Sequence, residues 1–397
     1  MNTWIIVGCV LLAFLYQLWL NHVDYQNNAR MVQYIPVNAI QESDLQQSYY
    51  AVATAEATHG IGANGNVISE DARRDLDKAD AYNVEAASSR KKTLRFLTYN
   101  IFIRPPGIQS AGTDYKDLRL QLLPSVLAEY DVICLQELFG TGSDRRNRLL
   151  SDLAKHGLGY SVFLPYQLGY FPPKLIDGGV TIVSRYPIEF SDFFVYSDAY
   201  LFTADVWTSK GILLARVQVP QADGNPLSVD VYSTHMQAHD AEDDRYTSVR
   251  YKQIKEMLAF VKRHSGTENH IVIAGDFNVN GRVSRSDDRD GPEYLSMMSL
   301  FGSDSADGRE WIDVLRRAND GRQIITGGDE YNVPKFGASK PKPVSCSKRL
   351  DYIMTSQGTE GKFSAVNIAV QPFEYNDRDD ISRLSDHLAL SAKLQWD

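Results

Sequence analysis

The chain has 397 residues, of which 43% are hydrophobic and 23% charged, so it is long enough for a globular protein with a sizeable core. Its formal net charge of -9 argues against a protein whose main role is to grip nucleic acid, because phosphate neutralisation usually requires a basic surface. The three cysteines, Cys9, Cys134 and Cys346, are too few and too scattered for a disulfide framework, and their spacing suits no zinc site.

An almost wholly apolar segment, Trp4 to Leu20, lies near the start of the chain and ends at Asn21 and His22. Its length is at the short limit for a membrane-spanning helix. A cleaved signal peptide is the alternative, but the basic start and the small-residue cleavage site that it needs are both missing. We therefore expect a hydrophobic anchor over residues 1–21 and a single-pass membrane protein, with secretion after signal cleavage as the alternative.

Residues 22–92 are rich in Asn, Gln, Ala and Tyr and poor in large aliphatic side chains. Within them, Ser69 to Glu85 has a helical pattern, with Ser69 in position to cap it. This composition predicts a partly helical stem or linker between the anchor and the main domain.

From residue 93 to residue 397, apolar strands are mixed with amphipathic helices. The pattern predicts strands near 94–99, 131–136, 160–165, 179–184, 189–196, 212–219, 227–234, 270–275, 349–354, 365–370 and 388–394, and helices near 117–130, 145–156, 243–264 and 292–301. Pro124 should bend or split the first helix. The mixture predicts an α/β domain in which sheets are buried between helices.

Polar side chains that can bind a metal or a phosphate follow several of these strands. They are Asn100, Glu137, His235, Asp276 with Asn278, and Asp386 with His387. Each alone is compatible with an ordinary turn or a solvated strand end. Such residues collect at one end of the sheet in layered α/β folds, however, and a charge beside the apolar run 132–135 needs a partner such as a divalent cation. Residues two apart along an extended chain point the same way, so Asp276 and Asn278 should leave the end of their strand side by side.

Six short segments stand in this order along the chain: Thr98-Tyr99-Asn100, Leu135-Gln136-Glu137, Ser233-Thr234-His235, Gly275-Asp276-Phe277-Asn278, Arg349-Leu350-Asp351-Tyr352 and Ser385-Asp386-His387. They resemble the motifs of the endonuclease/exonuclease/phosphatase superfamily, the metal-dependent phosphodiesterases that include DNase I. The resemblance runs from about Leu94 to the end of the sequence. It implies a four-layer sandwich of two mixed β-sheets flanked by helices, and hydrolysis of a phosphodiester by an activated water.

Three further segments carry more distinctive patterns. Gly179 to Ile188 is a strand before a Ser-Arg-Tyr-Pro-Ile turn, Thr234 to Ala238 reads Thr-His-Met-Gln-Ala, and Lys210 follows Asp205 by five residues. These segments resemble the neutral sphingomyelinase branch of the superfamily, the last of them only in outline. The resemblance implies Mg²⁺ as the cofactor and a sphingomyelin-like membrane lipid as the substrate, with no nucleic-acid partner expected.

Carried over residue by residue, the resemblance implies a metal site and a substrate site. Glu137 is the main Mg²⁺ ligand, Asn100 lies close to the metal and the phosphate, and Asp386 lies beside the metal or the water network. Lys210 contacts the substrate phosphate or pairs with Asp205. A solvated lysine on a loop is the alternative for Lys210.

The same resemblance implies the roles of the catalytic residues. Asp276 orients or deprotonates the attacking water, and Asn278 hydrogen-bonds a non-bridging phosphate oxygen. His387 is a candidate general base whose tautomer Asp351 holds, and His235 stabilises charge on the phosphoryl group or assists the leaving oxygen. Whether Asp276 or His387 takes the proton of the water stays open.

Two loops are candidates for contact with lipid. Residues 166–173 are aromatic and broken by proline, and residues 335–349 hold five basic side chains and no acidic one. Ordinary packed or solvated surface loops are the alternative for both.

We therefore expect a membrane-tethered, Mg²⁺-dependent phosphodiesterase that cleaves a sphingomyelin-like lipid to ceramide and the phosphorylated headgroup. A nuclease or an inositol phosphate phosphatase of the same superfamily is the alternative. The Trp-x-Gly-Asp-x-Asn and Cys-Asp-Arg-Ile elements of the phosphatase branch are not matched around Gly275 or at 345–349. A non-catalytic protein with this fold should lack some of the ligand residues, and none is missing here.

Overall fold

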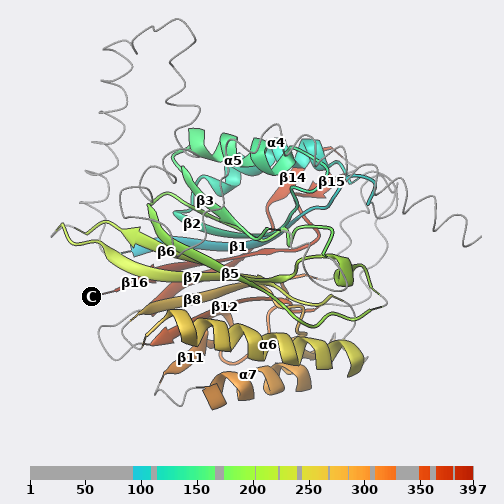
Figure 1. The fold of residues 1–397 in the computed structure, drawn as a ribbon, viewed down its shortest axis with the longest axis vertical. Helices are drawn as coiled ribbons and strands as arrows, with labels where there is room; N and C mark the ends of the chain where they lie inside the picture. The colour runs from blue at the N-terminus through green and yellow to red at the C-terminus, as the bar shows by residue number, and fades with distance from the viewer. Residues whose placement is uncertain are drawn as a thin grey trace, which may run out of the picture. The chain divides into compact units, whose positions relative to one another are not determined.

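Two six-stranded mixed sheets form the centre of the fold (Figure 1). The computed structural model describes residues 93–108, 114–165, 174–201, 203–221, 224–238, 244–266, 269–284, 286–304, 309–327, 348–357, 364–378 and 381–396. The strand order of the first sheet is β13 (Ser364–Gln371), β16 (Ala389–Gln395), β1 (Thr93–Ile103), β2 (Val132–Leu138), β4 (Thr181–Ser184) and β3 (Tyr160–Phe163). The strand order of the second is β11 (Glu310–Asp313), β12 (Asp351–Gln357), β8 (His270–Asp276), β7 (Leu227–His235), β6 (Gly211–Val219) and β5 (Ile188–Val195).

Each sheet contains one parallel pair of strands near its centre. β1 runs parallel to β2, and β7 runs parallel to β8, while the other neighbours are antiparallel. In the second pair Gly275 approaches the backbone of Thr234 so closely, with φ 144°, that a Cβ there would lie 2.1 Å from Thr234 O. Only glycine permits this contact, which fixes the register just before Asp276.

Helices cover the outer face of each sheet (Figure 1). α4 (Lys116–Leu127) and α5 (Arg145–Lys155) cover the first sheet, and α6 (Asp244–His264) and α7 (Pro292–Asp304) cover the second. The remaining elements are the short helices η2 (Ala204–Trp207) and α8 (Val314–Ala318) and two hairpins, β9 (Arg282–Ser284) with β10 (Asp287–Asp290) and β14 (Glu374–Arg378) with β15 (Ile381–Arg383). The four layers are therefore helix, sheet, sheet and helix.

The strands are apolar on both faces because both faces are covered. Along β8, Val272 and Ala274 face the core between the two sheets, whereas Ile271 and Ile273 pack against the layer of α6 and α7. Successive side chains of a strand point to opposite faces, so one continuous apolar run serves two cores. Burial on both faces therefore explains the continuous apolar run by which β8 was predicted from the sequence.

Every strand and helix predicted between residues 93 and 397 has a counterpart, with shifted ends. Pro124 does not split α4: it lies inside the helix, where its carbonyl still accepts from Ala128 N at 3.0 Å. The sequence did not predict β9, β10, β11, β14, β15, η2 or α8.

No helix among the described residues is both long enough and apolar enough to cross a membrane. The predicted anchor at residues 1–21 and the predicted stem at residues 22–92 lie outside those residues. Both stay predictions.

Candidate active site

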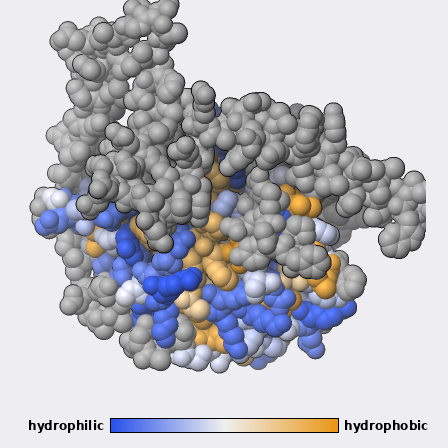
Figure 2. Space-filling view, in the orientation of Figure 1, coloured by the Kyte–Doolittle hydropathy of each residue, from blue (hydrophilic) through white to orange (hydrophobic). Residues whose placement is uncertain are grey.

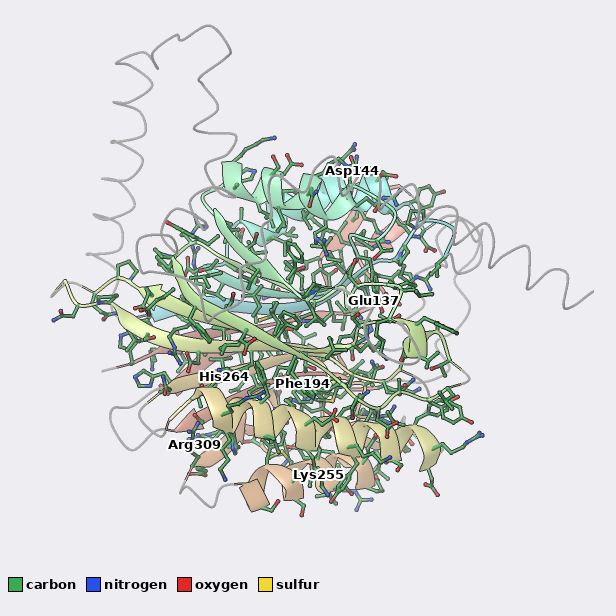
Figure 3. All side chains as sticks on the ribbon, in the orientation of Figure 1. Glu137, Asp144, Phe194, Lys255, His264 and Arg309 are labelled. Carbon is green, nitrogen blue, oxygen red and sulfur yellow. The ribbon has the colours of Figure 1, made fainter. Side chains whose placement is uncertain are left out.

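The topology brings the predicted polar residues to one end of both sheets. The parallel strands β1, β2, β7 and β8 carry, in that order, Asn100, Glu137, His235 and Asp276. β12 and β16 run antiparallel to β8 and β1, so they begin at this end, where Asp351 lies opposite Asp276 and His387 precedes β16. This end is on the right in Figure 3, where Glu137 is labelled.

The backbone at the site departs from a regular strand. β1 and β2 continue past Asn100 and Glu137, their pairing shifts between Asn100 and Ile103, and Glu137 has a left-handed φ of 57°. The expectation that these strands end at the two residues is therefore wrong. An irregularity within the sheet turns the side chains towards the site instead, at a cost in backbone strain.

Asn278 also lies in a left-handed conformation, with φ 53°. Its backbone N–H donates to Asp276 Oδ1 at 2.9 Å, and its side-chain Nδ2 donates to Met236 O at 3.1 Å. The chain is thus not extended here, and the alternation argument does not place Asp276 and Asn278. Instead, a turn in which the backbone N–H of Asn278 bonds to the carboxylate of Asp276 sets the positions of both residues.

Glu137 has one carboxylate oxygen without a partner. Its Oε1 accepts from Asn100 Nδ2 at 3.2 Å, while its Oε2 is buried and has no hydrogen-bond partner among the described residues. Burial, and then the charge of Asp386, raise the pKa of Glu137 from 4.5 to about 7. A buried carboxylate in this state gains most from a cation placed against the free oxygen.

Asp276 Oδ2 is the point at which three side chains meet. It lies 3.0 Å from Asn100 Nδ2, 3.6 Å from His235 Nε2 and 3.7 Å from His387 Nε2. Burial raises the pKa of Asp276 above its usual value, and the neighbouring His387 and Asn100 offset part of that effect. The amide nitrogen of Asn100 thus bridges the carboxylates of Glu137 and Asp276.

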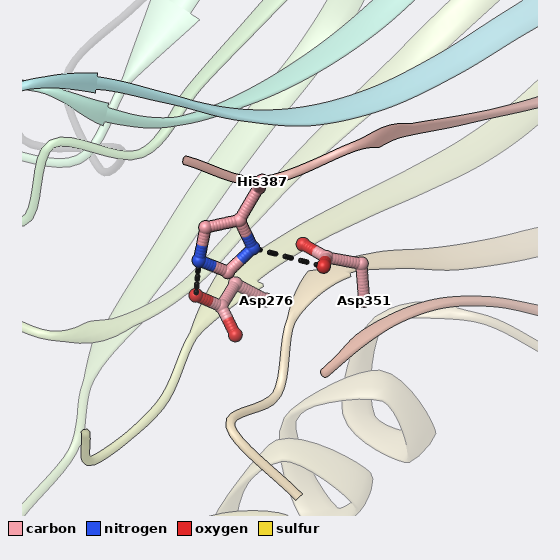
Figure 4. A group of neighbouring side chains, drawn as sticks. All are labelled: Asp276, Asp351 and His387. Atoms are coloured by element: carbon pink, nitrogen blue, oxygen red, sulfur yellow. Dashed lines mark hydrogen bonds and ion pairs between the residues drawn. The ribbon is translucent and has the colours of Figure 1, made fainter. Parts of the chain in front are cut away.

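His387 stands between two carboxylates, as Figure 4 shows. Its Nδ1 contacts Asp351 Oδ2 at 2.9 Å, which leaves Nε2 facing Asp276. Burial lowers the pKa of His387, but Asp351, Asp276 and Asp386 together outweigh burial and raise it well above its usual value. This is the arrangement predicted from sequence for a histidine whose tautomer an aspartate fixes.

His235 has the opposite environment. Burial, then Lys210, then His387 hold its pKa well below the usual value, so it stays neutral. Lys210 Nζ lies 3.1 Å from His235 Nε2, donates to Met236 O at 2.7 Å and pairs with Asp205 Oδ2 at 3.0 Å. An ammonium group only donates, so Nε2 accepts and Nδ1 carries the hydrogen. His235 Nδ1 is buried and has no partner among the described residues.

Gln237 supports this cluster, and the sequence assigned it no role. Its Nε2 donates to Asp205 Oδ2 at 2.9 Å and its Oε1 accepts from Tyr200 N at 2.9 Å. Its backbone N–H donates to Gln253 of α6. The Thr-His-Met-Gln-Ala pattern contained Gln237, but nothing in that pattern reveals partners so far away in the chain.

Asp386 and His387 are positioned by Ser385 and Arg119. Ser385 Oγ donates to Asn100 O at 2.5 Å and contacts Asp386 Oδ1 at 3.2 Å. The fully buried Arg119 donates to Ile101 O at 2.8 Å and to Leu384 O at 3.0 Å, and so joins the end of β1 to the segment that precedes β16. No sequence pattern indicates Arg119, because its partners are backbone carbonyls.

The donor set at Glu137 fits a hard divalent cation. Glu137 Oε2 is free, and burial raises the pKa of Asp386 as it does that of Glu137. Asp276, Asp351 and His387 also have ligand atoms within 4.8 Å of one another. In the group of Asp276, Asp351 and His387, the imidazole of His387 already lies between the two carboxylates. Because its pKa is raised, the imidazole is positively charged and would repel a metal ion bound there. The oxygen ligands of Glu137 and Asp386 suit Mg²⁺ better.

The two predicted lipid loops lie largely outside the described residues. Within the second, Arg349 is fully buried and bonds to Asp313 Oδ1 and Gln323 Oε1. The prediction that Arg349 belongs to a basic lipid-facing surface is therefore wrong. The buried guanidinium of Arg349 pairs with Asp313 and so fixes the chain just before β12, which starts at Asp351.

The chain was compared with known proteins. It is 27% identical to a sphingomyelinase of Dictyostelium discoideum over 66% of this chain and 84% of that protein, and 24% identical to sphingomyelinase C of Bacillus cereus over 72% and 82%. Its structure resembles a crystal structure of a beta toxin mutant from Staphylococcus aureus with bound magnesium ions, with a TM-score of 0.53 and 22% identity over 75% of this chain and 98% of that one.

A profile of the endonuclease/exonuclease/phosphatase family matches residues 97–387. That range begins within β1, contains every other strand of the two sheets except β16, and ends at His387, so it includes every residue that the site brings together. The chain is an enzyme of the endonuclease/exonuclease/phosphatase family, a family of phosphodiesterase hydrolases, and within it resembles the sphingomyelinase branch.

Proposed function

We propose that this protein is a Mg²⁺-dependent phosphodiesterase that hydrolyses a sphingomyelin-like lipid by phospholipase C-type cleavage, giving ceramide and the phosphorylated headgroup. The observation that carries the proposal is the buried Glu137 Oε2, which has no partner among the described residues. The other oxygen of this carboxylate shares Asn100 Nδ2 with Asp276 Oδ2, the atom that His235 and His387 both approach. The names of the sphingomyelinase relatives support the substrate class. The magnesium ions of the structural neighbour support the metal.

Glu137 and Asp386 would hold the cation. A bound Mg²⁺ polarises the phosphoryl group and neutralises the charge that develops on its oxygens. Asn100, which donates to both Glu137 and Asp276, fixes the distance between the metal ligand and the carboxylate that handles the water. This preorganisation positions the reacting groups before the substrate arrives.

Asp276 and His387 act as a pair on the attacking water. The water attacks phosphorus in line with the leaving oxygen, and its proton passes to the Asp276 carboxylate, which faces the charged imidazole of His387. Asp351 holds His387 Nδ1–H, so that Nε2 stays directed towards Asp276. Asn278, on the turn after Asp276, donates to a non-bridging oxygen of the phosphate.

His235 and Lys210 act on the leaving side. The hydrogen on His235 Nδ1 has no other described partner and is free to bond a phosphoryl or leaving oxygen. Lys210 lies against His235 Nε2 and places a positive charge beside the phosphoryl group, and Asp205 holds Lys210 in place. The P–O bond to the ceramide oxygen breaks with its electron pair on that oxygen, which takes a proton from a water molecule and leaves as the alcohol.

The test offers the full chain sphingomyelin, lysophospholipid, duplex DNA and inositol phosphates, each with Mg²⁺ and with chelator. We expect chelator-sensitive release of ceramide and phosphorylated headgroup from sphingomyelin, and its loss in Glu137→Gln, which keeps the shape of the side chain but not its charge. Turnover that is as fast with chelator as with Mg²⁺ would contradict the mechanism. Metal-dependent cleavage of DNA alone would identify a nuclease, and cleavage of inositol phosphates alone would identify an inositol phosphate phosphatase.

A further inference from the structure

Thr326 is a buried polar residue to which the sequence assigned no role. The face of the protein drawn in Figure 2 mixes hydrophobic and hydrophilic residues, as globular surfaces commonly do, so a polar side chain in the interior is the more informative feature. Thr326 is completely buried and lies between α8 and β12, outside any helix or strand. A buried hydroxyl must find hydrogen-bond partners, and these partners show what it holds.

The hydroxyl of Thr326 accepts two backbone hydrogen bonds at the start of β12. Leu350 N and Asp351 N both donate to its Oγ1, each at 3.0 Å. A hydroxyl offers two acceptor lone pairs, and both are used here. The backbone N–H of Thr326 donates in turn to Lys348 O at 3.1 Å. These three bonds fix the chain at the point where Asp351 enters the site.

Thr326 also fixes the segment that carries His387. Its carbonyl oxygen accepts from Leu388 N at 2.5 Å, so it bonds to the residue directly after the histidine. The next residue along the chain, Gly327, lies so close to the ring that a Cβ there would be 2.6 Å from His387 Nδ1. Thr326 is thus bonded to the backbone on both sides of the contact between Asp351 and His387.

The carboxylate of Asp351 has no other hydrogen bond among the described residues. Its Oδ2 contacts His387 Nδ1 at 2.9 Å, while its Oδ1 is buried without a partner. The position of this carboxylate therefore follows from the position of its own backbone. Because the hydroxyl of Thr326 holds that backbone, it sets the distance between the carboxylate and the imidazole.

We propose that Thr326 is a positioning residue for the hydrolysis, which holds Asp351 and His387 at bonding distance before the substrate arrives. This inference rests on the proposed function, in which His387 and Asp276 act on the attacking water. An aliphatic side chain at this position would leave two buried N–H groups without their acceptor, and the chain would have to move to satisfy them. A misplacement of about 1 Å is enough to slow turnover by about 100-fold.

The test separates the hydroxyl from the rest of the side chain. Thr326→Val keeps the branched shape and removes the acceptor, whereas Thr326→Ser keeps the hydroxyl and loses a methyl group. Thr181→Val is the matched control, because Thr181 on β4 is also completely buried but its Oγ1 has no hydrogen-bond partner among the described residues. All variants are made in the full chain, checked by thermal denaturation, and assayed with Mg²⁺ on sphingomyelin in detergent micelles.

We expect Thr326→Val to lower kcat by about 100-fold and to change KM by less than about threefold, because the substrate still binds and only the reacting groups are misplaced. Thr326→Ser should stay within about fivefold of the wild type, and Thr181→Val should keep full turnover. Wild-type kcat in Thr326→Val would overturn the proposal, and so would an equal loss in Thr326→Ser. If valine prevents folding, Thr326→Ala replaces it, since alanine differs from serine by one oxygen atom.

A second readout does not depend on turnover. The Nδ1–H of an imidazole that is bonded to a carboxylate gives a proton NMR signal far downfield, and its absence in His387→Gln assigns the signal of His387. With chelator present, we expect this signal in the wild type and in Thr326→Ser, and its loss or upfield shift in Thr326→Val. An unchanged signal in Thr326→Val would refute the proposal. If the wild type hydrolyses no substrate, the proposed function fails, while this signal still decides whether Thr326 holds the contact.

Discussion

A single oxygen atom, Asp276 Oδ2, faces one amide and two imidazoles of opposite character. His235 is kept neutral, while the pKa of His387 is raised by the carboxylates around it. Two histidines with pKa values pushed apart can take separate roles, one on the side of the water and one on the side of the leaving group.

The pairing of His387 with Asp351 leads to a first prediction at the scale of the residue. Asp351→Asn keeps the shape of the side chain but removes the charge that holds Nδ1–H. We expect turnover to fall by about 10³-fold, because the imidazole loses its orienting partner and its raised pKa. Steady-state kinetics and thermal denaturation measure the two effects separately. Ser356→Ala, five positions along the same strand, is the control; near-normal turnover of Asp351→Asn would remove Asp351 from the mechanism.

The carboxyl of Glu137 leads to a second prediction, on pH. Its pKa of about 7 in the folded protein exceeds the usual 4.5, so between these values the metal-free folded state binds more protons than the unfolded state. The free energy of unfolding must therefore fall as the pH rises through this window. Added Mg²⁺ should stabilise the protein more above about pH 7 than near pH 5, since it competes with the proton for the same oxygen.

Thermal denaturation with Mg²⁺ or chelator across this pH range measures both trends. In Glu137→Gln the dependence on Mg²⁺ should disappear and the fall with pH should become smaller. The same substitution at Glu310, which is exposed on β11, should leave both unchanged. If Mg²⁺ does not change the thermal stability of the wild-type protein at any pH, Glu137 is not a ligand of the metal.

At the scale of the element, the sequence predicted what periodic patterns encode. Long apolar runs gave the strands of both sheets, because each strand is buried on two faces. β10 escaped notice because Asp287–Asp290 has no apolar residue; ion pairs and hydrogen bonds such as Asp290 with Arg316 hold it. The residues that the site brings together were predictable from their motifs. Arg119 and Gln237 were not, since each bonds to distant atoms that leave no local signal.

Gly327 shows how closely a neighbouring segment fits His387. A Cβ there would lie 2.6 Å from His387 Nδ1, although the backbone itself would accept alanine. We expect Gly327→Ala to displace the imidazole from Asp351 and to lower kcat by about 100-fold, because a small misplacement of a catalytic group is costly. Gly159→Ala, where a Cβ would meet open space, is the matched control for kinetics and thermal denaturation. Equal activity of both variants would contradict this account of the fit.

At the scale of the whole molecule, the predicted anchor carries its own test. If residues 1–21 form an uncleaved anchor, the full chain should stay with membranes in high salt and alkaline carbonate and should be released by detergent. Deletion of residues 1–21 should remove that behaviour without removing turnover of a soluble phosphodiester. Protein found in the medium, with a new N-terminus beyond the apolar segment, would favour the signal-peptide alternative.

The place of β16 has a consequence for protein synthesis. This strand lies between β13 and β1, yet a ribosome produces it after every other strand of that sheet. Ser385 bonds to Asn100 across 285 positions, so the first half of the site must wait for residues made much later. A nascent polypeptide that lacks β16 has no strand to join β13 to β1, and until His387 has been made the site is incomplete. A prematurely terminated product would be inactive, with two open strand edges for chaperones or proteases to recognise.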